Sequence, residues 1–388
     1  MHILEIPSFF PPYGGWFCLD QSKALAAQGH TVRILACVQL GVTISRWQFV
    51  TAATRVEKRQ MDGIEVYYRQ LRGWPLCKHR NMKRWVSAVE QMAARYVATH
   101  GVPDIIHAHC AKWAGFAAQA LSRRYSVPYV ITEHLSHQVF DTELHGRTDA
   151  WQIPLLKDAY REAARVVTVS EELVADIAPY FGTDYRHTAI SNTVDTRFFA
   201  YREREPKGGR PMRFCSLAMF IPLKGYDVLL KAFRTLVEQR RVDASLAIAG
   251  TYTDSPRLAA MVKALKLEDR VKIYGLVDKQ RVRDILYQSD CLVLASRSEA
   301  QPLVLLEAMS TGIPVITTEV APQAMRITGC HVVPVDDVEA LAGMMEQVAL
   351  SPADGDSRQM SRHVAEMASP EAVGSRLSKL FSEVVSTQ

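Results

Sequence analysis

Strand-like and helix-like segments alternate along nearly the whole chain, and they do so in two successive series. Short apolar runs predict the strands of the first series at residues 2–6, 31–36, 64–68, 104–108, 129–132 and 166–169. The strands of the second series are predicted at residues 213–218, 245–249, 271–274, 291–295, 314–317 and 331–334. Because this alternation is typical of a parallel sheet with crossover helices, it predicts two α/β domains.

The length of the chain and one unusual segment place the domain boundary. A chain of 388 residues is too long for one ordinary core and suits two domains. Residues 202–211 are charged and rich in glycine and proline, which is the composition of a linker. We therefore predict one domain over residues 1–193, a linker over 194–211 and a second domain over 212–370. Residues 371–388 have the pattern of an amphipathic helix.

Composition excludes several classes of protein. No apolar run is long enough to span a bilayer, and the first residues lack the pattern of a signal peptide. Seven dispersed cysteines without metal-like spacing indicate the reduced thiols of a cytoplasmic protein. The sequence has no G-x-G-x-x-G and no P-loop, which argues against a dinucleotide oxidoreductase or an NTPase. A net charge of +5 fits anionic ligands or a lipid surface.

Two glutamates separated by seven residues, Glu299 and Glu307, follow the predicted strand at 291–295. Pro302 suits the first position of a helix, because its missing N–H would have no partner there. Glu299 would then lie in the loop after a strand, and Glu307 on the helix at 303–311. Free N–H groups at that helix start favour an anion. The spacing predicts a phosphorylated ligand held between two carboxylates, although a strand, a loop and a helix with two glutamates also occur by chance.

Residues 290–316 resemble the E-x7-E signature of retaining, nucleotide-sugar-dependent glycosyltransferases of family 4. The resemblance implies a GT-B fold, in which two Rossmann-like domains face a central cleft. The first domain would bind the acceptor and the second the donor, and the last helix would cross back to the first domain. The implied reaction moves a sugar from a UDP- or GDP-sugar to a glycan or lipid-linked acceptor of a bacterial surface polysaccharide. It implies no metal, no other cofactor and no nucleic acid partner.

The resemblance also assigns roles around the two glutamates. Glu299 would contact the transferred sugar near the reacting carbon, and Glu307 would accept hydrogen bonds from the ribose. Backbone amides would face the sugar and the phosphates at Ala300, Gln301 and Leu303. The segment 217–225 resembles the loop that carries the Arg and Lys of the family's diphosphate clamp. Lys224 matches the lysine, but Met219 stands where the arginine is expected, so half of the clamp is in doubt.

Two glycine-containing motifs resemble further parts of the donor site. Gly14 and Gly15 lie between the first strand and the first helix, where the family's glycine loop faces the donor diphosphate and the acceptor. The alternative for this pair is an ordinary tight turn between a strand and a helix. Gly275 ends a strand that resembles the one packed against the nucleobase in the family.

Three histidines end two of the predicted strands. His134, in Thr-Glu-His, resembles the active-site histidine of the family and would hydrogen-bond the transferred sugar. His107 and His109 would only support that loop. At the domain junction, the segment 190–195 resembles a turn motif of the family, and we assign a structural role to Asn192 within it.

Basic and aromatic residues gather in a short stretch of the first domain, namely Trp74, Lys78, Arg80, Lys83, Arg84 and Trp85. Such a cluster fits anionic lipid headgroups and peripheral attachment to the inner face of a membrane. The alternative is a solvated helix face with two packed tryptophans.

Two other functions are compatible with the same residues. A sugar-nucleotide epimerase of the same fold would convert its substrate without an acceptor. A weakly active, nucleotide-sugar-binding scaffold partner in a polysaccharide assembly complex would tolerate Met219 in place of the arginine.

Overall fold

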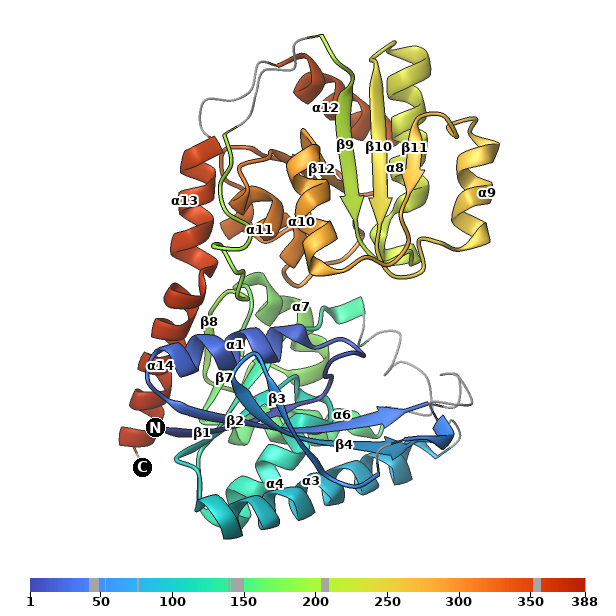
Figure 1. Cartoon of the computed structure of the whole chain (residues 1–388). Coiled ribbons are helices and arrows are strands. Elements are labelled where there is room, and N and C mark those ends of the chain that lie inside the picture. The colour runs from blue at the N-terminus through green and yellow to red at the C-terminus, as the bar shows by residue number, and fades with distance from the viewer. Residues whose placement is uncertain are drawn as a thin grey trace. The chain divides into compact units, whose positions relative to one another are not determined.

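The computed structural model describes residues 1–41, 49–52, 54–74, 77–138, 140, 150–203, 209–351 and 357–387. The chain divides into two compact units (Figure 1). Unit 1 comprises Met1–Thr193 together with Pro370–Gln388, and unit 2 comprises Val194–Ser369. Each unit is built on its own sheet, which is wholly or almost wholly parallel, so the predicted α/β class with two Rossmann-like domains is confirmed.

The sheet of unit 1 has eight strands in the order β3-β4-β2-β1-β5-β6-β7-β8. They are β1 (His2–Pro7), β2 (Thr31–Leu40), β3 (Glu57–Met61), β4 (Ile64–Arg72), β5 (Ile105–His109), β6 (Tyr129–Glu133), β7 (Arg165–Thr168) and β8 (His187–Ala189). Every neighbouring pair is parallel except β3 and β4. All six strands predicted for the first series are present.

Strand β3 was not predicted, because its sequence, Glu-Lys-Arg-Gln-Met, has no apolar run. It pairs antiparallel with β4 at the edge of the sheet, with Met61 opposite Ile64. Asp62 and Gly63 form the two-residue turn and both have positive φ angles, of 50° and 83°. Asp-Gly is a strong sequence signal for a hairpin of this type. The turn therefore indicates the hairpin, although the sequence of β3 itself does not indicate a strand.

Helices cover both faces of this sheet, with α1 and α14 on one face and α3 and α4 on the other (Figure 1). Within the described residues, the helices of unit 1 include α1 (Trp16–Ala27), α3 (Lys78–His100), η1 (Ala111–Gly115), α4 (Phe116–Tyr125), α6 (Gln152–Glu162), α7 (Glu172–Phe181) and α14 (Pro370–Ser386). Helix α14, from the end of the chain, packs directly against α1. Gly374 permits this approach, since a Cβ atom there would lie 2.6 Å from the carbonyl oxygen of Ala24.

The sheet of unit 2 has six strands in the order β11-β10-β9-β12-β13-β14, all of them parallel. They are β9 (Met212–Leu217), β10 (Ala244–Ala249), β11 (Val271–Ile273), β12 (Cys291–Leu294), β13 (Val315–Thr318) and β14 (Cys330–Val333). The helices are η2 (Pro222–Lys224), α8 (Tyr226–Arg234), η3 (Thr235–Gln239), α9 (Pro256–Ala264), α10 (Lys279–Gln288), α11 (Leu303–Ser310), η4 (Gln323–Met325), α12 (Val338–Leu350) and α13 (Ser357–Ala368). All six predicted strands of the second series are present.

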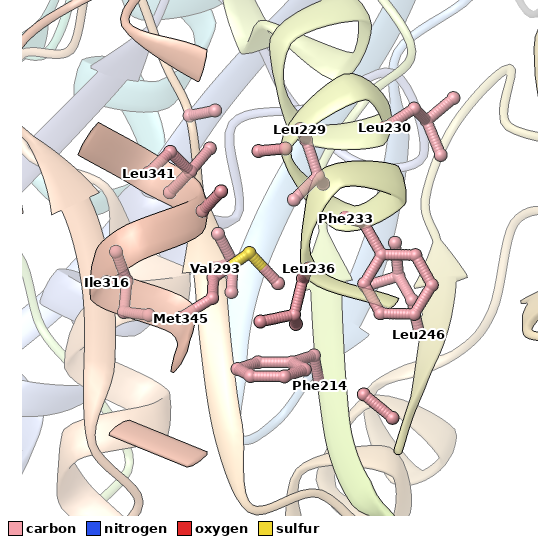
Figure 2. Close-up of a cluster of buried hydrophobic side chains, with 14 of the residues drawn as sticks. Phe214, Leu229, Leu230, Phe233, Leu236, Leu246, Val293, Ile316, Leu341 and Met345 are labelled. Carbon is pink, nitrogen blue, oxygen red and sulfur yellow. The ribbon is translucent and has the colours of Figure 1, made fainter. Parts of the chain in front are cut away.

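The core of unit 2 has two layers because successive strand residues point to opposite faces of the sheet. Along β12, Cys291 and Val293 join the layer under α8 and α12, whereas Leu292 and Leu294 join the layer under α10, α11 and α13. Figure 2 shows the first layer, in which Phe233 and other side chains of α8 point at the sheet. Strands buried on both faces read as continuous apolar runs, which is why this series was predictable.

The first part of the predicted linker belongs to unit 2. Phe199 is buried in its core, and the backbone N–H of Val194 donates to the carbonyl of Ala368, at 2.8 Å. Residues 204–208 lie outside the described residues.

Candidate functional site

Each sheet reverses its strand order once, and the predicted site residues follow the strands at those points. The reversal lies between β1 and β5 in unit 1 and between β9 and β12 in unit 2. Ligands of open α/β sheets bind outside the carboxyl ends of the strands at such switch points. Gly14 and Gly15 follow β1, Lys224 follows β9 and Glu299 follows β12. The candidate residues of each unit therefore lie at the switch point of its own sheet.

In unit 2, the loops after β9 and β12 are joined by close backbone contacts. The backbone N–H of Arg297 donates to the carbonyl of Leu223, at 2.7 Å. Gly225 has a φ angle of 60°, and a Cβ atom at this position would lie 2.0 Å from the carbonyl oxygen of Ala295. Only glycine fits such an approach, so Gly225 fixes the position of Lys224 beside the second loop.

Lys224 and Glu299, predicted independently from two motifs, form an ion pair. The Nζ of Lys224 donates to Oε1 of Glu299 at 2.5 Å, and the Oγ of Ser296 donates to the same oxygen at 2.6 Å. The side chains are 18% and 8% exposed. Water screens a pair this buried only weakly, so the two charges attract each other at short range.

Arg297 supports this arrangement and was missed by the sequence analysis. Its Nε donates to Asp336 at 2.7 Å, one Nη donates to Asp227 at 2.8 Å, and the other donates to the carbonyl of Pro222. Burial acts to raise the pKa of Asp227, but hydrogen bonding to the Arg297 guanidinium lowers it overall. All three nitrogens of Arg297 are thus engaged in holding the two loops, so Arg297 does not replace the arginine expected at Met219.

Helix α11 begins at Leu303, after Pro302, and Glu307 is the only charged residue among its eight. Leu305, Leu306 and other apolar side chains are buried against the sheet, whereas Glu307 is partly exposed. The residues predicted to offer backbone amides lie where the loop enters this helix; Ala300 and Gln301 are buried, and Leu303 is partly buried.

Three exposed apolar side chains lie in the loops after β9, β10 and β11, namely Met219, Tyr252 and Leu276. Backbone hydrogen bonds join the first loop to the second and the second to the third. The N–H of Phe220 donates to the carbonyl of Thr251, and the N–H of Gly250 donates to the carbonyl of Gly275, each at 2.9 Å. Gly275 has a φ angle of 73° and lies two residues beyond the end of β11, whereas the sequence analysis placed it at the end of the strand. Met219 is 44% exposed, so the position expected to carry an arginine presents a thioether to solvent.

In unit 1, the two glycines after β1 differ in what they permit. Gly15 has a φ angle of 75°, and a Cβ atom there would lie 2.0 Å from the carbonyl oxygen of Phe9. The turn itself therefore requires Gly15, which supports the structural alternative for that residue. Gly14 has a φ angle of 96°, and a Cβ atom there would meet no atom within 4 Å, so the backbone at Gly14 lies beside open space.

His134 follows β6 and is held by the residue before it. Glu133 is fully buried, and its Oε1 accepts the backbone N–H groups of His134 and Leu135, at 3.0 and 3.1 Å. Its Oε2 accepts from the Tyr160 hydroxyl and the Ala111 N–H, at 2.9 and 3.0 Å. Burial raises the pKa of Glu133. This carboxyl group thus fixes the backbone from which the His134 ring projects.

The ring of His134 belongs to a hydrogen-bonded chain that we call the histidine chain: Glu5, His109, His134 and Asn192. Oε2 of Glu5 lies 2.8 Å from Nε2 of His109, and Nδ1 of His109 lies 3.2 Å from Nε2 of His134. Nδ1 of His134 then lies 2.8 Å from Oδ1 of the Asn192 side-chain amide. The His134 ring also stacks on Phe17, with centroids 3.8 Å apart. Both ring nitrogens of His134 are therefore engaged within unit 1.

Burial and charge set the protonation of this chain. Burial acts to raise the pKa of Glu5, but the neighbouring His107 and His109 lower it to about 2. Burial, together with His107, lowers the pKa of His109 to about 4. Burial, together with His109, lowers the pKa of His134 well below its usual value. At neutral pH the Glu5 carboxylate is therefore charged and the imidazoles of His109 and His134 are neutral.

Within the described residues, Glu5, His107 and His109 are the one group of side chains of metal-ligand type whose atoms lie within 4.8 Å of one another. All three are fully buried. Oε2 of Glu5 is 2.8 Å from a nitrogen of each histidine, a hydrogen-bond distance. Ligand atoms that share one tetrahedral zinc ion at about 2.0–2.1 Å stand roughly 3.3 Å apart. The spacing fits protons between these atoms better than an ion.

The basic and aromatic cluster is only partly as predicted. Lys78, Arg80, Lys83 and Arg84 are exposed on α3, and we call these four residues the basic patch. Trp74 is 51% exposed and contacts Phe49 edge-on. Trp85 is fully buried, and its Nε1 donates to the carbonyl of Cys37 at 2.6 Å, so its predicted place at a membrane surface is wrong. Helix α3 is amphipathic, and Trp85 lies on the face that packs against β2.

Comparisons with known proteins extend what the geometry shows. Residues 14–198 match the family model described as Glycosyltransferase Family 4, and residues 198–366 match Glycosyl transferases group 1. The chain is 26% identical over 380 residues to a glycogen synthase of Mycobacterium tuberculosis, covering 92% of this chain and 88% of that protein. It is 28% identical over 338 residues to the candidate teichuronic acid biosynthesis glycosyltransferase TuaC of Bacillus subtilis, covering 82% and 81%.

The structure of sucrose-phosphate synthase from Thermosynechococcus elongatus superimposes with a TM-score of 0.82 at 18% identity, over 100% of both chains. Two Rossmann-like units, with charged side chains at the switch point of the second, define a GT-B glycosyltransferase. The two family models together span residues 14–366, and the chain belongs to glycosyltransferase family 4. Within the described residues, no helix is both long and apolar enough to cross a membrane.

Proposed function

We propose that this glycosyltransferase moves a hexose from a nucleotide diphosphate donor to a glycan or lipid-linked acceptor, with retention of anomeric configuration. The observation that carries the proposal is the Lys224–Glu299 pair at the switch point of unit 2. A lysine held beside a carboxylate offers the diphosphate a positive charge and the sugar an acceptor of hydrogen bonds. Glu307, eight positions further along on α11, would take the ribose hydroxyls.

The leaving diphosphate would be stabilised by fixed charges and dipoles. Lys224 and the N-terminus of α11 would lie against its oxygens, which is electrostatic stabilisation of a leaving group. The amides entering that helix, at Ala300, Gln301 and Leu303, would face the phosphates and the sugar. Gly275 would let the loop after β11 approach the nucleobase, and Gly14 would leave open space beside the donor. With these charges supplied by the chain, we propose that no metal is needed.

The reaction would proceed on one face of the sugar. The bond from the anomeric carbon to the phosphate oxygen breaks, and an acceptor hydroxyl forms the new bond from the same side. The departing phosphate oxygen takes the proton of that hydroxyl, so no separate base is required. Glu299 would stabilise the sugar as positive charge develops near the anomeric carbon.

The acceptor is proposed to be lipid-linked and to belong to a bacterial surface polysaccharide. Two features support this: the relative TuaC, described for teichuronic acid biosynthesis, and the basic patch with the exposed Trp74 near it. Cationic side chains beside an interfacial aromatic favour peripheral attachment to an anionic leaflet. We therefore propose that the enzyme works at the cytoplasmic face of the membrane.

A screen of sugar nucleotides by thermal shift, followed by a transfer assay with lipid-linked oligosaccharides, tests the proposal. A true donor should raise the unfolding temperature by mass action. The product's anomeric coupling in proton NMR should match that of the donor; inversion would overturn retention. Conversion of the donor without any acceptor would indicate the epimerase instead.

A second candidate function is favoured by Met219. Its exposed thioether occupies the place of the clamp arginine, which fits a weakly active scaffold that binds a sugar nucleotide. Nucleotide release that rises with added acceptor would exclude the scaffold, whereas binding without any release would support it.

A further inference from the structure

The histidine chain links a fully buried carboxylate to His134, the histidine that we propose to hydrogen-bond the transferred sugar. Glu5 lies on β1 and His109 on β5, which are neighbouring strands; Glu5 pairs with His107 and Pro7 with His109 in the register. His134 follows β6, the next strand in the sheet. Three adjacent strands therefore place Glu5, His109 and His134 in one row, which ends at the partly exposed ring of His134.

Each contact in the row needs one hydrogen, and the carboxylate fixes where that hydrogen lies. A carboxylate only accepts, so Nε2 of His109 must donate to Oε2 of Glu5. Nδ1 of a neutral His109 is then an acceptor, so Nε2 of His134 must donate to it. Nδ1 of a neutral His134 is left as an acceptor, and Asn192 must turn its amide NH2 group toward it. The structure places Oδ1 of Asn192 toward this nitrogen, so the argued direction requires the amide to be flipped. Amide oxygen and nitrogen are nearly identical in shape, so the flipped side chain fits the same positions.

We infer that Glu5 is a positioning residue which, through His109, holds His134 in the Nε2–H tautomer and so presents the Nδ1 lone pair as an acceptor. In the structure that lone pair faces Asn192. A sugar hydroxyl is a donor of the same kind as the Asn192 amide, and it could take its place. This role rests on the proposed function, because it assumes that His134 contacts the transferred sugar.

Two further observations support a directional role for Glu5. None of the described residues donates a hydrogen bond to its second oxygen, Oε1, although the residue is fully buried. Nδ1 of His107 lies 2.8 Å from Oε2, but the angle does not give a hydrogen bond. Among the described residues, the one well-aligned side-chain hydrogen bond to this buried charge is therefore the one from His109. An isolated buried carboxylate is costly, and burial without full compensation is more typical of a functional group than of a core residue.

The first experiment measures the tautomers directly, with protein labelled with ¹⁵N at histidine. Two-bond ¹H–¹⁵N correlation spectra at neutral pH distinguish Nε2–H, Nδ1–H and doubly protonated rings. Assignment comes from single His→Gln variants at positions 109 and 134. We expect both rings to be neutral with hydrogen on Nε2. A His134 ring protonated on Nδ1, or on both nitrogens, overturns the inference without touching the proposed transfer.

The second experiment uses Glu5→Gln, which keeps the shape but can offer either an oxygen or an NH2 group to His109. The hydrogen bonds from residue 5 through His109 to His134 can then run in either direction, so a second His134 tautomer should appear. The expected kinetic effect is a fall in kcat of about 10-fold, with the donor KM within about twofold. Glu5→Asp, which keeps the charge but is shorter, should recover part of the kcat. A changed tautomer with unchanged kcat overturns the positioning role.

Asp176→Asn is the matched control, because Asp176 hydrogen-bonds Nδ1 of His137 in a partly exposed pair outside the row. It should leave the His134 spectrum and kcat unchanged. Equal losses in both variants would indicate a general structural effect and overturn the inference. Zinc at one equivalent in the purified protein would also overturn it, since a bound ion would replace the proton between Glu5 and His109. The expected tautomers in a protein that transfers no sugar would instead overturn the proposed function.

Discussion

The candidate residues of the two units hold charge in opposite ways. In unit 2, Lys224 and Glu299 form a largely buried ion pair between side chains that both carry a full charge. In unit 1, a buried carboxylate is matched by neutral imidazoles on neighbouring strands. A pair of the first kind can exchange partners when an anion binds. A row of the second kind is preorganised and changes little. We therefore propose that the ion pair of unit 2 rearranges when the charged donor binds, whereas unit 1 presents hydrogen-bonding groups to the sugar in fixed positions.

The largest effect is expected at Glu299, the carboxylate that we propose to contact the sugar. Glu299→Ala should lower kcat by at least about 100-fold, the scale typical of a lost electrostatic contact in the transition state. Nucleotide binding should be kept, because Lys224 loses its competing partner. Glu339→Ala, which removes an exposed carboxylate of the same unit paired with Arg240, is the control. Steady-state kinetics with a lipid-linked acceptor would contradict the assignment if kcat were unchanged.

Removing the second glutamate should instead weaken the binding of the nucleotide. Glu307→Ala removes charge-assisted hydrogen bonds to the ribose, a loss of roughly 1.5–3 kcal/mol. Isothermal titration with UDP and GDP measures it. The partly exposed position on α11 predicts little change in the unfolding temperature. Equal affinity in the variant and the parent would remove Glu307 from the donor site.

The comparison between units extends to their surfaces, because the basic patch belongs to unit 1. Replacing Lys83 and Arg84 with Glu should reduce binding to anionic vesicles by roughly 30-fold at low salt, from about 1 kcal/mol per cation removed. Cosedimentation at low and high ionic strength measures this, with Arg123 and Arg124 on α4 changed to Glu as the matched control. A parent protein that stays in the supernatant at low salt would make the patch an ordinary solvated face.

Acid should weaken unit 1 before unit 2. Because the folded pKa of His109 is about 4 and its unfolded value is about 6.5, the unfolded state binds more protons between these values. The stability that depends on a neutral His109 is therefore present above pH 6.5 and is lost as the pH falls toward 4. At pH 5 the loss would be roughly 2 kcal/mol for this group. Hydrogen exchange, corrected for intrinsic rates, should show strands β1 and β5 losing protection while β9 and β12 do not. Equal losses would mean that the row is not the acid-sensitive element.

The smallest effect is expected where unit 2 departs from its family. Met219→Arg should tighten nucleotide binding by about 1 kcal/mol if the side chain reaches the diphosphate, through a contact to phosphate oxygens. Weaker binding would show that another cation already occupies that space. No change in the titration would place Met219 away from the phosphates.

The fold was largely predictable because its strands are buried on both faces. An unbroken apolar run predicts the strand Cys291–Leu294, and a proline that suits a helix start predicts the helix after Pro302. Edge strand β3 did not, because an exposed edge needs no apolar residues and only its Asp-Gly turn marks it.

Candidate residues can be named from the sequence where a motif is local, whereas a contact that only the fold brings together cannot. Lys224 and Glu299 were each found from their own loop, although nothing in the sequence says that they pair. Glu5 is the clearest omission, since an acid inside a strand has no local signal. Its meaning depends on β1 lying beside β5, a pairing between residues more than 100 positions apart. The prediction that Trp85 lies at a membrane surface was wrong for a related reason. The sequence does not say which face of α3 packs against the sheet.

The packing of α14 on α1 has a consequence for how the chain is made. Val373, Leu377 and Phe381 complete the apolar layer over Ile3 and Ile105, so the first unit to be synthesised is finished by the last helix. Unit 2 is continuous in sequence and can fold once its own residues have been synthesised. Unit 1 keeps part of one face of its sheet uncovered until α14 has been synthesised. Contacts that distant are slow to form, and uncovered apolar surface invites aggregation in the meantime. Truncations that spare every residue of the site, but remove α14, should therefore yield insoluble protein rather than an inactive enzyme.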